Sequence, residues 1–382
     1  MITTFHLPTK IIFGTGSLAQ LGEEAKKIGR KAMLVTGSSS MRKAGVTDRV
    51  VHDLKANGVD TLIFDKVEPN PRASTVDEGA RIVRGSGVEL VIGLGGGSAM
   101  DMAKGIALAS TGTKPIWDYI IEGVIEVTDE PVPPLILVPT VAASGSEANN
   151  EAVITNWETH DKRFVGSPYM FPRVSIVDPG LTLTLPEKPT AQGGVDIFCH
   201  VAEPYITTKT PSPLTDGIME TTMRLVVTSL PQVLSKLDDI EARTLLSWAC
   251  TVACSQVATL GGGAGPLTLH HISYPLSAYY DLAHGETLAA LLPAWMRYTF
   301  AARPERFYSL GRNVFGETDG VLATEKWLEK VGMRLQLRDL GIEPERFEEM
   351  ANYVVRTYPS DAESHPTLLD AAAIAQIYQD SY

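Results

Sequence analysis

Cysteine is scarce in this chain: only Cys199, Cys250 and Cys254 occur among 382 residues. They form no CxxC pair and are too few for a disulfide framework, which excludes a small disulfide-stapled fold and a cysteine-rich zinc site. The first residues also lack the charged segment and apolar stretch of a secretory signal peptide. Because low cysteine content is typical of a reducing compartment, we predict a cytoplasmic protein.

Positive charge and long hydrophobic runs are also lacking. The formal net charge is -12 at pH 7, whereas binding to nucleic acid requires clustered Lys and Arg. The longest apolar runs, such as Leu288–Trp295, are far too short to cross a bilayer. We therefore expect neither nucleic acid nor a membrane among the partners. An acidic surface is consistent with an enzyme that acts on small, uncharged molecules.

The first half of the chain alternates short apolar runs with stretches of helical periodicity. The predicted strands are Ala32–Thr36, Thr61–Phe64, Leu90–Gly93, Leu135–Val138 and Val174–Val177. The predicted helices are Ser17–Ile28, Val46–Asn57, Ser74–Ser86 and Ser98–Ser110. Short runs rich in Val, Ile and Leu are typical of parallel strands buried on both faces. This βαβ order predicts an α/β domain with a doubly wound, mostly parallel sheet.

After Pro186 the pattern changes to helical periodicity with few β-branched runs. A chain of 382 residues with 44% hydrophobic residues is long enough to build more than one core. We therefore predict a dinucleotide-binding α/β domain over residues 1–185 and an all-α, metal-binding domain over residues 186–382.

A glycine-rich loop follows the predicted strand Leu90–Gly93. The run Gly95-Gly96-Gly97-Ser98 leads into a predicted helix, so a phosphate can approach backbone N–H groups at a positively polarised helix start. Ser98 stands where the third glycine of the usual dinucleotide fingerprint belongs. The loop therefore indicates phosphate binding without naming a cofactor, and a tight turn with nothing bound is the alternative.

A second loop, from Pro139 to Asn150, follows the next predicted strand. Its small hydroxyl residues around Gly145, among them Thr140 and Ser144, can bond a ribose or a phosphate. An ordinary polar loop that begins with a helix cap is the alternative.

The second half carries a set of candidate metal ligands. Asp196 and His200 are four residues apart in a stretch of helical periodicity, which places both side chains on one face of a helix. His270, His271 and His284 follow. A carboxylate with neutral imidazoles suits Fe²⁺ or Zn²⁺. Taken singly, such an Asp–His pair is more often a salt bridge or a capped core histidine than a metal site.

Together these segments resemble the iron-containing (group III) alcohol dehydrogenases. The resemblance is carried by Gly95-Gly96-Gly97-Ser98-x-x-Asp101-x-x-Lys104, by Pro139-Thr140 with Ser144-Gly145-Ser146-Glu147, by Asp196 with His200, and by His270 with His284. It covers nearly the whole chain. It implies two domains with cofactor and metal in the cleft between them, a homodimer, and hydride transfer between NAD(P)(H) and a small primary alcohol or aldehyde.

The resemblance also implies roles for individual residues. Asp196, His200, His270 and His284 would bind the metal, because the fourteen-residue interval of the family selects His270 over His271. Gly95, Gly96, Gly97 and Ser98 would contact the pyrophosphate, and Thr140 and Ser144 the nicotinamide side. Asp101 and Lys162 would lie near the dinucleotide.

This chain departs from the family at Tyr274. Many members have there a histidine that is considered part of a proton path. A phenol, with an ordinary pKa near ~10, is a poorer relay at neutral pH than an imidazole. Tyr274 is a candidate catalytic residue of the pocket, and simple packing is the alternative.

The end of the strand at Thr36 bears on the choice of cofactor. NAD-preferring members have an Asp at the position of Gly37, where a carboxylate would bond the ribose and repel a 2′-phosphate. Here Gly37 is followed by three serines, including Ser38 and Ser40, and then by Arg42 and Lys43. We therefore predict a preference for NADP(H) over NAD(H), as in the NADPH-dependent butanol dehydrogenase and aldehyde reductase branch that this segment resembles.

Two other functions remain open from the sequence. One is a different enzyme on the same scaffold, similar to glycerol dehydrogenase or dehydroquinate synthase. The synthase would need a pocket rich in Lys and Arg, whereas the stretches around these candidate ligands are apolar and aromatic. The other is a catalytically silent nucleotide-binding protein, which four intact candidate ligands disfavour.

Overall fold

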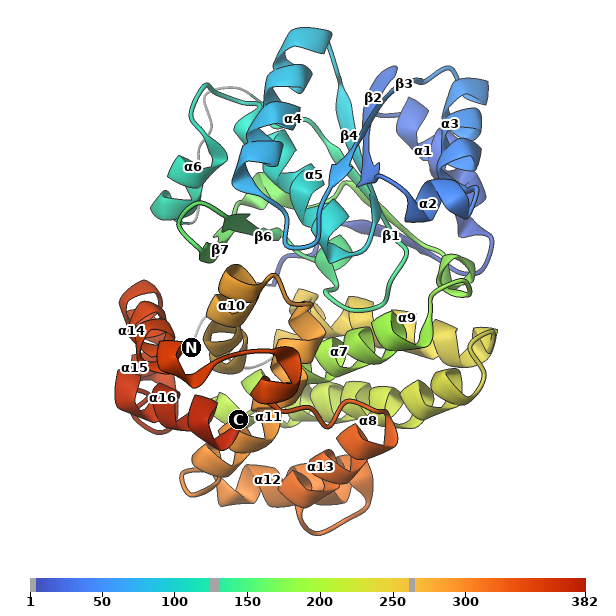
Figure 1. Ribbon diagram of the computed structural model, residues 1–382. Helices are drawn as coiled ribbons and strands as arrows, with labels where there is room; N and C mark the ends of the chain where they lie inside the picture. Colours follow the sequence, from blue (N-terminus) through green and yellow to red (C-terminus); the bar gives the residue numbers. More distant parts are fainter. Residues whose placement is uncertain (1–4, 124, 126–130, 261–264) are drawn as a thin grey trace. The chain divides into compact units, whose positions relative to one another are not determined.

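The computed structural model describes residues 5–123, 125, 131–260 and 265–382, and the chain divides into two compact units (Figure 1). One unit is Leu7–Thr184, and the other consists of Leu185–Tyr382 together with the start of the chain. The backbone N–H of His6 donates to Oε1 of Gln256 at 2.9 Å. The described residues before Leu7 therefore group with the helical unit and not with the α/β domain of residues 1–185 that the sequence predicts.

Six parallel strands form the main sheet of the first unit, in the order β1-β8-β5-β4-β2-β3. Their bounds are β1 Lys10–Phe13, β2 Lys31–Gly37, β3 Asp60–Val67, β4 Leu90–Gly95, β5 Leu135–Pro139 and β8 Val174–Val177. The chain passes from β2 outward to β3 and then returns to the other side of β2 as β4. The sheet is therefore doubly wound, as predicted, and its topological switch point lies between β2 and β4.

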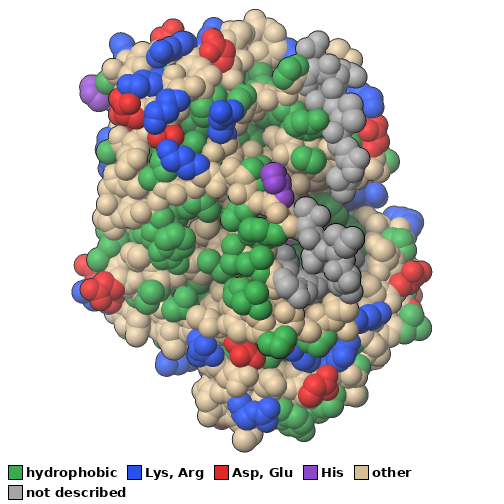
Figure 2. Space-filling model, turned by 180° about the vertical axis from the view of Figure 1, so that it is seen from behind, with side chains coloured by type: hydrophobic (Ala, Val, Ile, Leu, Met, Phe, Trp, Pro, Cys, Tyr) green, Lys and Arg blue, Asp and Glu red, His purple; other side chains and the backbone are tan. Residues whose placement is uncertain are grey.

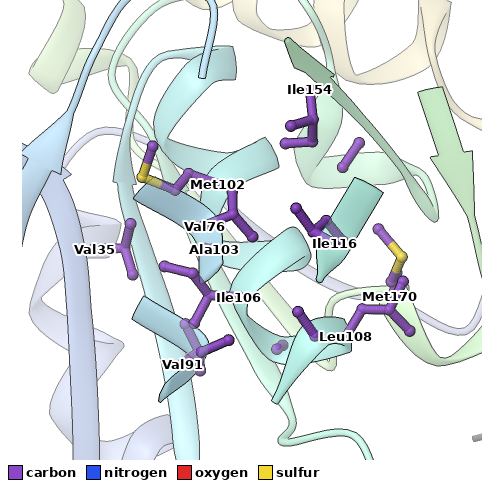
Figure 3. Close-up of a cluster of buried hydrophobic side chains, with 14 of the residues drawn as sticks. Val35, Val76, Val91, Met102, Ala103, Ile106, Leu108, Ile116, Ile154 and Met170 are labelled. Carbon is purple, nitrogen blue, oxygen red and sulfur yellow. The ribbon is translucent and has the colours of Figure 1, made fainter. Parts of the chain in front are cut away.

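Helices cover both faces of this sheet (Figure 1). They are α1 Leu21–Lys26, α2 Ser40–Lys43, α3 Val46–Ala56, α4 Ala73–Ser86, α5 Gly97–Ala109 and α6 Ile116–Glu122. Successive strand residues point to opposite faces. Ala32 and Leu34 therefore join a core with α1 and α3, whereas Met33 and Val35 join a second core with α4, α5 and α6. Figure 3 shows Val35 and Val91 of the sheet facing Ile106 of α5 in this second core.

The sequence analysis missed three strands of this unit. β1 is a four-residue edge strand in which no residue is fully buried, and its short apolar run, Ile11 to Phe13, was overlooked. β6 (Glu151–Asn156) and β7 (Asp161–Gly166) form an antiparallel hairpin outside the main sheet. Both strands begin with charged residues, and burial of Ile154 and Val165 against the α5 core holds the hairpin in place.

The second unit is all-α over its described residues, as predicted. Its helices are α7 Glu187–Thr207, α8 Pro213–Ser235, α9 Ile240–Ala253, α10 Thr268–Tyr280, α11 His284–Phe300, α12 Pro304–Leu310, α13 Gly320–Lys330, α14 Phe347–Thr357, α15 Pro359–Ser364 and α16 Ala371–Asp380. Helix α7 is central and packs against α8, α9, α10 and α11. A Cβ on Gly194 would lie 2.4 Å from a methyl carbon of Leu230, so glycine permits the close crossing of α7 and α8.

No helix in the described ranges is both long enough and apolar enough to span a membrane. On the face drawn in Figure 2, Lys and Arg side chains lie interspersed with Asp and Glu. The exposed pairs Arg42–Asp65 and Lys66–Glu78 are examples of such mixed charge.

Candidate metal centre

Three helices of the second unit bring the predicted metal ligands together. Asp196 and His200 lie one turn apart in α7, His270 lies in the first turn of α10, and His284 is the first residue of α11. Nε2 of His270 is 3.6 Å from Oδ1 of Asp196, and Nε2 of His284 is 3.9 Å from the same oxygen. Asp196, His270 and His284 form a group whose ligand atoms all lie within 4.8 Å of one another.

His200 lies beside this group of three. Its Nδ1 is 2.9 Å from the backbone oxygen of Asp196. A carbonyl oxygen can only accept, so Nδ1 carries the proton and Nε2 keeps its lone pair. The rings of His200 and His270 are 4.3 Å apart at their centroids.

Two polar atoms at the centre of this group are left without a hydrogen bond. Oδ1 of Asp196 and Nε2 of His270 are both buried, and neither has a hydrogen-bond partner among the described residues. Buried polar atoms without partners are rare because each costs about 1–3 kcal/mol. A cation between them would satisfy both, and the donor set of one carboxylate and imidazoles fits Fe²⁺ or Zn²⁺.

The electrostatics of the centre favour a cation in the same place. Burial opposes ionisation of Asp196, but the charges of the surrounding histidines and the contact with His270 keep its pKa well below the ordinary value. Burial alone would lower the pKa of His270, yet Glu203 and Asp196 raise it to about 9. Burial lowers the pKa of His200. The two carboxylates thus stabilise one positive charge between them.

Glu203 is a residue next to this group that the sequence analysis missed. Its side chain is fully buried, and its Oε1 lies 2.5 Å from Nδ1 of His270. The available signal was its spacing, since residue 203 lies seven positions after Asp196 and therefore on the same face of α7. Ser273 was also missed: its Oγ is 3.4 Å from Nδ1 of His284 and donates to the backbone oxygen of His270 at 2.7 Å.

A tight connection between α10 and α11 positions His284. Asp281 adopts a left-handed conformation with φ 53° at the end of α10, which turns the chain back toward α7. A Cβ on Gly285 would lie 2.4 Å from the backbone oxygen of Gln192 in α7. Glycine at this position therefore lets the first turn of α11 lie directly on the backbone of α7.

Tyr274 lies in a cluster of buried aromatic rings next to the candidate ligands. Its ring centroid is 5.8 Å from that of His284 and 5.3 Å from that of His271. His271 stacks on Tyr358 at 3.9 Å with an interplanar angle of 3°. The structure therefore brings His270, and not His271, to Asp196. These apolar and aromatic surroundings fit Tyr274 both as a residue of the substrate pocket and as a packing residue.

The candidate nucleotide residues of the first unit follow three adjacent strands. Gly37, Ser38 and Ser40 come at the end of β2, Gly95 to Ser98 at the end of β4, and Thr140 at the end of β5. The backbone N–H of Thr140 donates to the oxygen of Gly95 at 2.9 Å, and a Cβ on Gly97 would lie 2.6 Å from Oγ of Ser144. The two loops therefore pack together at the carboxyl ends of β4 and β5, beside the switch point where such sheets bind ligands.

Asp101 and Lys162 have protein partners in this unit. Asp101 accepts from Oγ of Ser146 at 2.7 Å and from the backbone N–H of Val153 at 3.0 Å. Burial raises the pKa of Asp101. Nζ of Lys162 donates to Oδ1 of Asn70 at 2.9 Å. Asp101 thus ties α5 to the second loop and to the hairpin.

Comparison with known proteins covers both units. Residues 8–179 match the family model for iron-containing alcohol dehydrogenase, and residues 190–382 match the model for the C-terminal part of the Fe-containing alcohol dehydrogenase family. NADH-dependent butanol dehydrogenase A of Clostridium acetobutylicum is 34% identical over 389 residues, which cover 99% of each chain. 1,3-Propanediol dehydrogenase of Citrobacter freundii is 31% identical, covering 99% of this chain and 98% of that protein. The crystal structure of NADH-dependent butanol dehydrogenase A from Thermotoga maritima has a TM-score of 0.93 and 35% identity, covering 99% of this chain and 98% of that one.

A doubly wound sheet with a glycine loop near its switch point, together with a helical unit that carries an Asp/His group, is typical of metal-dependent dehydrogenases. The chain belongs to the iron-containing alcohol dehydrogenase family. The family predicted from the residues is therefore confirmed. The protein is an oxidoreductase, an alcohol dehydrogenase that uses a nicotinamide dinucleotide.

Replacing Gly285 by alanine should separate the candidate ligands. The new Cβ would collide with the backbone of Gln192, which cannot move as a side chain can. We expect Gly285→Ala to displace His284 and to weaken Zn²⁺ binding on the order of tenfold, measured by competition with a chelator.

The matched control is Gly217→Ala in α8, where a Cβ would meet no atom within 4 Å. It should leave metal binding unchanged and stabilise the helix by about 1 kcal/mol. Equal metal affinities of the two variants would show that contact of α11 with α7 does not position His284.

Proposed function

We propose that Asp196, His200, His270 and His284 bind one divalent metal, Fe²⁺ or Zn²⁺, and that this centre takes the oxygen of a small primary alcohol or aldehyde. The observation that carries the proposal is the pair of buried atoms without hydrogen bonds, Oδ1 of Asp196 and Nε2 of His270. The nearby aromatic rings of Tyr274, His271 and Tyr358 are suited to a small, largely apolar substrate. The relatives named for butanol and 1,3-propanediol support this substrate class.

The nucleotide site of the proposal lies at the switch point of the sheet. Gly95, Gly96 and Gly97 leave the backbone N–H groups at the start of α5 accessible to a pyrophosphate. Thr140 and Ser144 lie against this loop, and we assign them to the nicotinamide side. Asp101 has two internal partners, so we assign it to holding the second loop in place beside the cofactor. Lys162, which donates to Asn70, is also assigned to the neighbourhood of the dinucleotide.

Each cofactor has one task in this reaction. When bound, the metal supplies Lewis-acid polarisation of the substrate oxygen, and the nicotinamide supplies or accepts the hydride. The protein orients the imidazoles: the protonated Nδ1 of His200 holds its ring against α7. Burial of Asp196 and His270 excludes water from the centre. The proton leaves or arrives through solvent, through hydroxyl groups or through the phenol of Tyr274, which we keep as a candidate residue of the pocket.

The central test measures turnover and metal content together. Protein stripped of metal and reloaded separately with Fe²⁺ and with Zn²⁺ is assayed with butyraldehyde and either NADPH or NADH. We expect metal-restored turnover, and we expect Asp196→Ala to lose both metal and activity while remaining folded. Retention of both by Asp196→Ala would refute the ligand assignment.

The control is Asp239→Ala. Asp239 caps α9 in the same unit, so its loss should cost about 1 kcal/mol of stability without affecting metal or turnover. If the wild-type protein binds metal tightly but turns over no butyraldehyde with either cofactor, the proposed substrate class is contradicted.

We further propose a preference for NADP(H), because Gly37 places no carboxylate at the end of β2. Exposed Ser38 and Ser40 follow it, while one nearby cation, Arg42, is paired with Asp65 at 3.1 Å. The curated relatives with 34% and 35% identity are named as NADH-dependent butanol dehydrogenases, so this preference would set the chain apart from them.

Gly37→Asp tests the preference directly. A Cβ at Gly37 would meet no atom within 4 Å, so the new carboxylate can be accommodated. We expect the wild-type NADPH/NADH ratio of kcat/KM to exceed unity and to fall on the order of tenfold or more in Gly37→Asp, because like charges repel. Gly37→Asn, of the same size but without charge, should keep the wild-type preference. A wild-type ratio below unity would contradict the proposal.

We also propose that the protein is a homodimer, on the basis of the family resemblance, and that it is cytoplasmic, on the basis of its low cysteine content. Light scattering checks the first point: a mass near that of one 41.3 kDa chain would contradict it.

A further inference from the structure

Glu203 joins two helices of the metal-binding unit from a fully buried position. It belongs to α7, and its carboxylate accepts three hydrogen bonds from the first turn of α10. Oε2 accepts from the backbone N–H groups of Leu269 and His270 at 2.7 and 3.2 Å. Oε1 lies 2.5 Å from Nδ1 of His270. The carboxylate therefore contacts both the backbone and the ring of a proposed metal ligand.

The contact at Oε1 decides which nitrogen of His270 carries the proton. An ionised carboxylate has no hydrogen to give, so Nδ1 must be the donor. In the neutral ring the lone pair is then on Nε2, the atom that lies 3.6 Å from Oδ1 of Asp196. Glu203 thus fixes the tautomer that can bind a metal, and it also fixes the plane of the ring.

The charges of the centre give Glu203 a second effect. A divalent cation held by Asp196 and neutral imidazoles leaves one positive charge uncompensated in a buried site. Uncompensated buried charge is costly. With the buried carboxylate of Glu203 included, the net charge of the divalent metal and the two carboxylates is zero.

We propose that Glu203 is a positioning residue that sets the metal affinity of this centre, through the ring of His270 and through its own buried charge. The inference rests on the proposed metal centre. The simpler explanation is that Glu203 only caps α10, whose first-turn N–H groups otherwise lack partners. That role would affect folding but would leave the metal affinity unchanged.

Glu203→Gln separates the two explanations because glutamine has the same shape but only one acceptor oxygen. If this oxygen serves the backbone N–H groups, the amide N–H₂ faces Nδ1 of His270 and favours the tautomer with the proton on Nε2. If the oxygen serves Nδ1, the N–H₂ faces two N–H donors. Both arrangements disfavour metal binding.

The experiment uses stripped full-length protein and Zn²⁺ alone as the probe, with Kd measured by competition against a chromogenic chelator. We expect Glu203→Gln to raise the Kd by about 10- to 100-fold. The Co²⁺-loaded variant should also show a shifted ligand-field absorption spectrum. A Kd within about twofold of the wild-type value (under 0.5 kcal/mol), together with an unchanged Co²⁺ spectrum, would reduce Glu203 to a helix cap.

The matched control is Asp178→Asn in the other unit. Asp178 is also a buried carboxylate, and it accepts from the backbone N–H groups of Gly16, Leu18 and Gly180 at 3.0, 3.2 and 2.9 Å. Asp178→Asn should lower the Tm without changing the Kd for Zn²⁺. If the wild-type protein itself binds no Zn²⁺, the proposed centre fails, which is a different outcome from equal binding by wild type and Glu203→Gln.

A measurement on the wild-type protein keeps the proposal testable if Glu203→Gln does not fold. Metal-free protein labelled with ¹⁵N in its histidines reports the protonated ring nitrogen by NMR, and His270 is assigned by loss of its signals in His270→Gln. Because Glu203 and Asp196 raise the pKa of His270 to about 9, the spectrum is recorded well above that pH, where the ring is neutral, and we expect its single proton on Nδ1 before any metal is added. A proton on Nε2 alone would overturn the proposal.

Discussion

The buried carboxylate of Asp196 requires positive charge, and the helical unit is arranged around this requirement. Three histidines from α7, α10 and α11 lie next to it, and Glu203 lies behind one of them. Burying a carboxylate without a counter-charge would cost more than the fold gains from a single contact. The short turn at Asp281 and the glycine at residue 285, where α11 contacts α7, both bring His284 to this charge.

The α/β unit depends on a different constraint, the close approach of the chain to itself at the ends of β4 and β5. Because Gly97 has no side chain, the side chain of Ser144 can lie against its backbone. The backbone N–H of Thr140 donates a hydrogen bond to the backbone oxygen of Gly95. The same lack of side chains that permits this packing keeps the start of α5 accessible to a phosphate. Folding and the proposed nucleotide binding thus call for the same glycines.

The residues that could be predicted from the sequence are those whose pattern is local. Continuous apolar runs indicate β2, β4, β5 and β8, because parallel strands are buried on both faces. The four-residue spacing of Asp196 and His200 indicates a shared helix face. The edge strand β1 has only a three-residue apolar run, and both strands of the β6–β7 hairpin begin with charged residues, so these strands depend on long-range packing. The choice of His270 over His271 came from the family interval, because neighbouring histidines look alike without the direction of the helix. Glu203 was missed because its role depends on α10, which lies 65 residues further along the chain.

The most direct test of the metal centre is anomalous diffraction from crystals soaked in Zn²⁺ or, without oxygen, in Fe²⁺. A single anomalous peak about 2.0–2.2 Å from Oδ1 of Asp196 and from Nε2 of His200, His270 and His284 would establish the proposed ligand set and the orientation of all three rings. A peak bound through Nδ1 of any of these histidines, or a metal found only elsewhere while this group of residues stays metal-free, would contradict it.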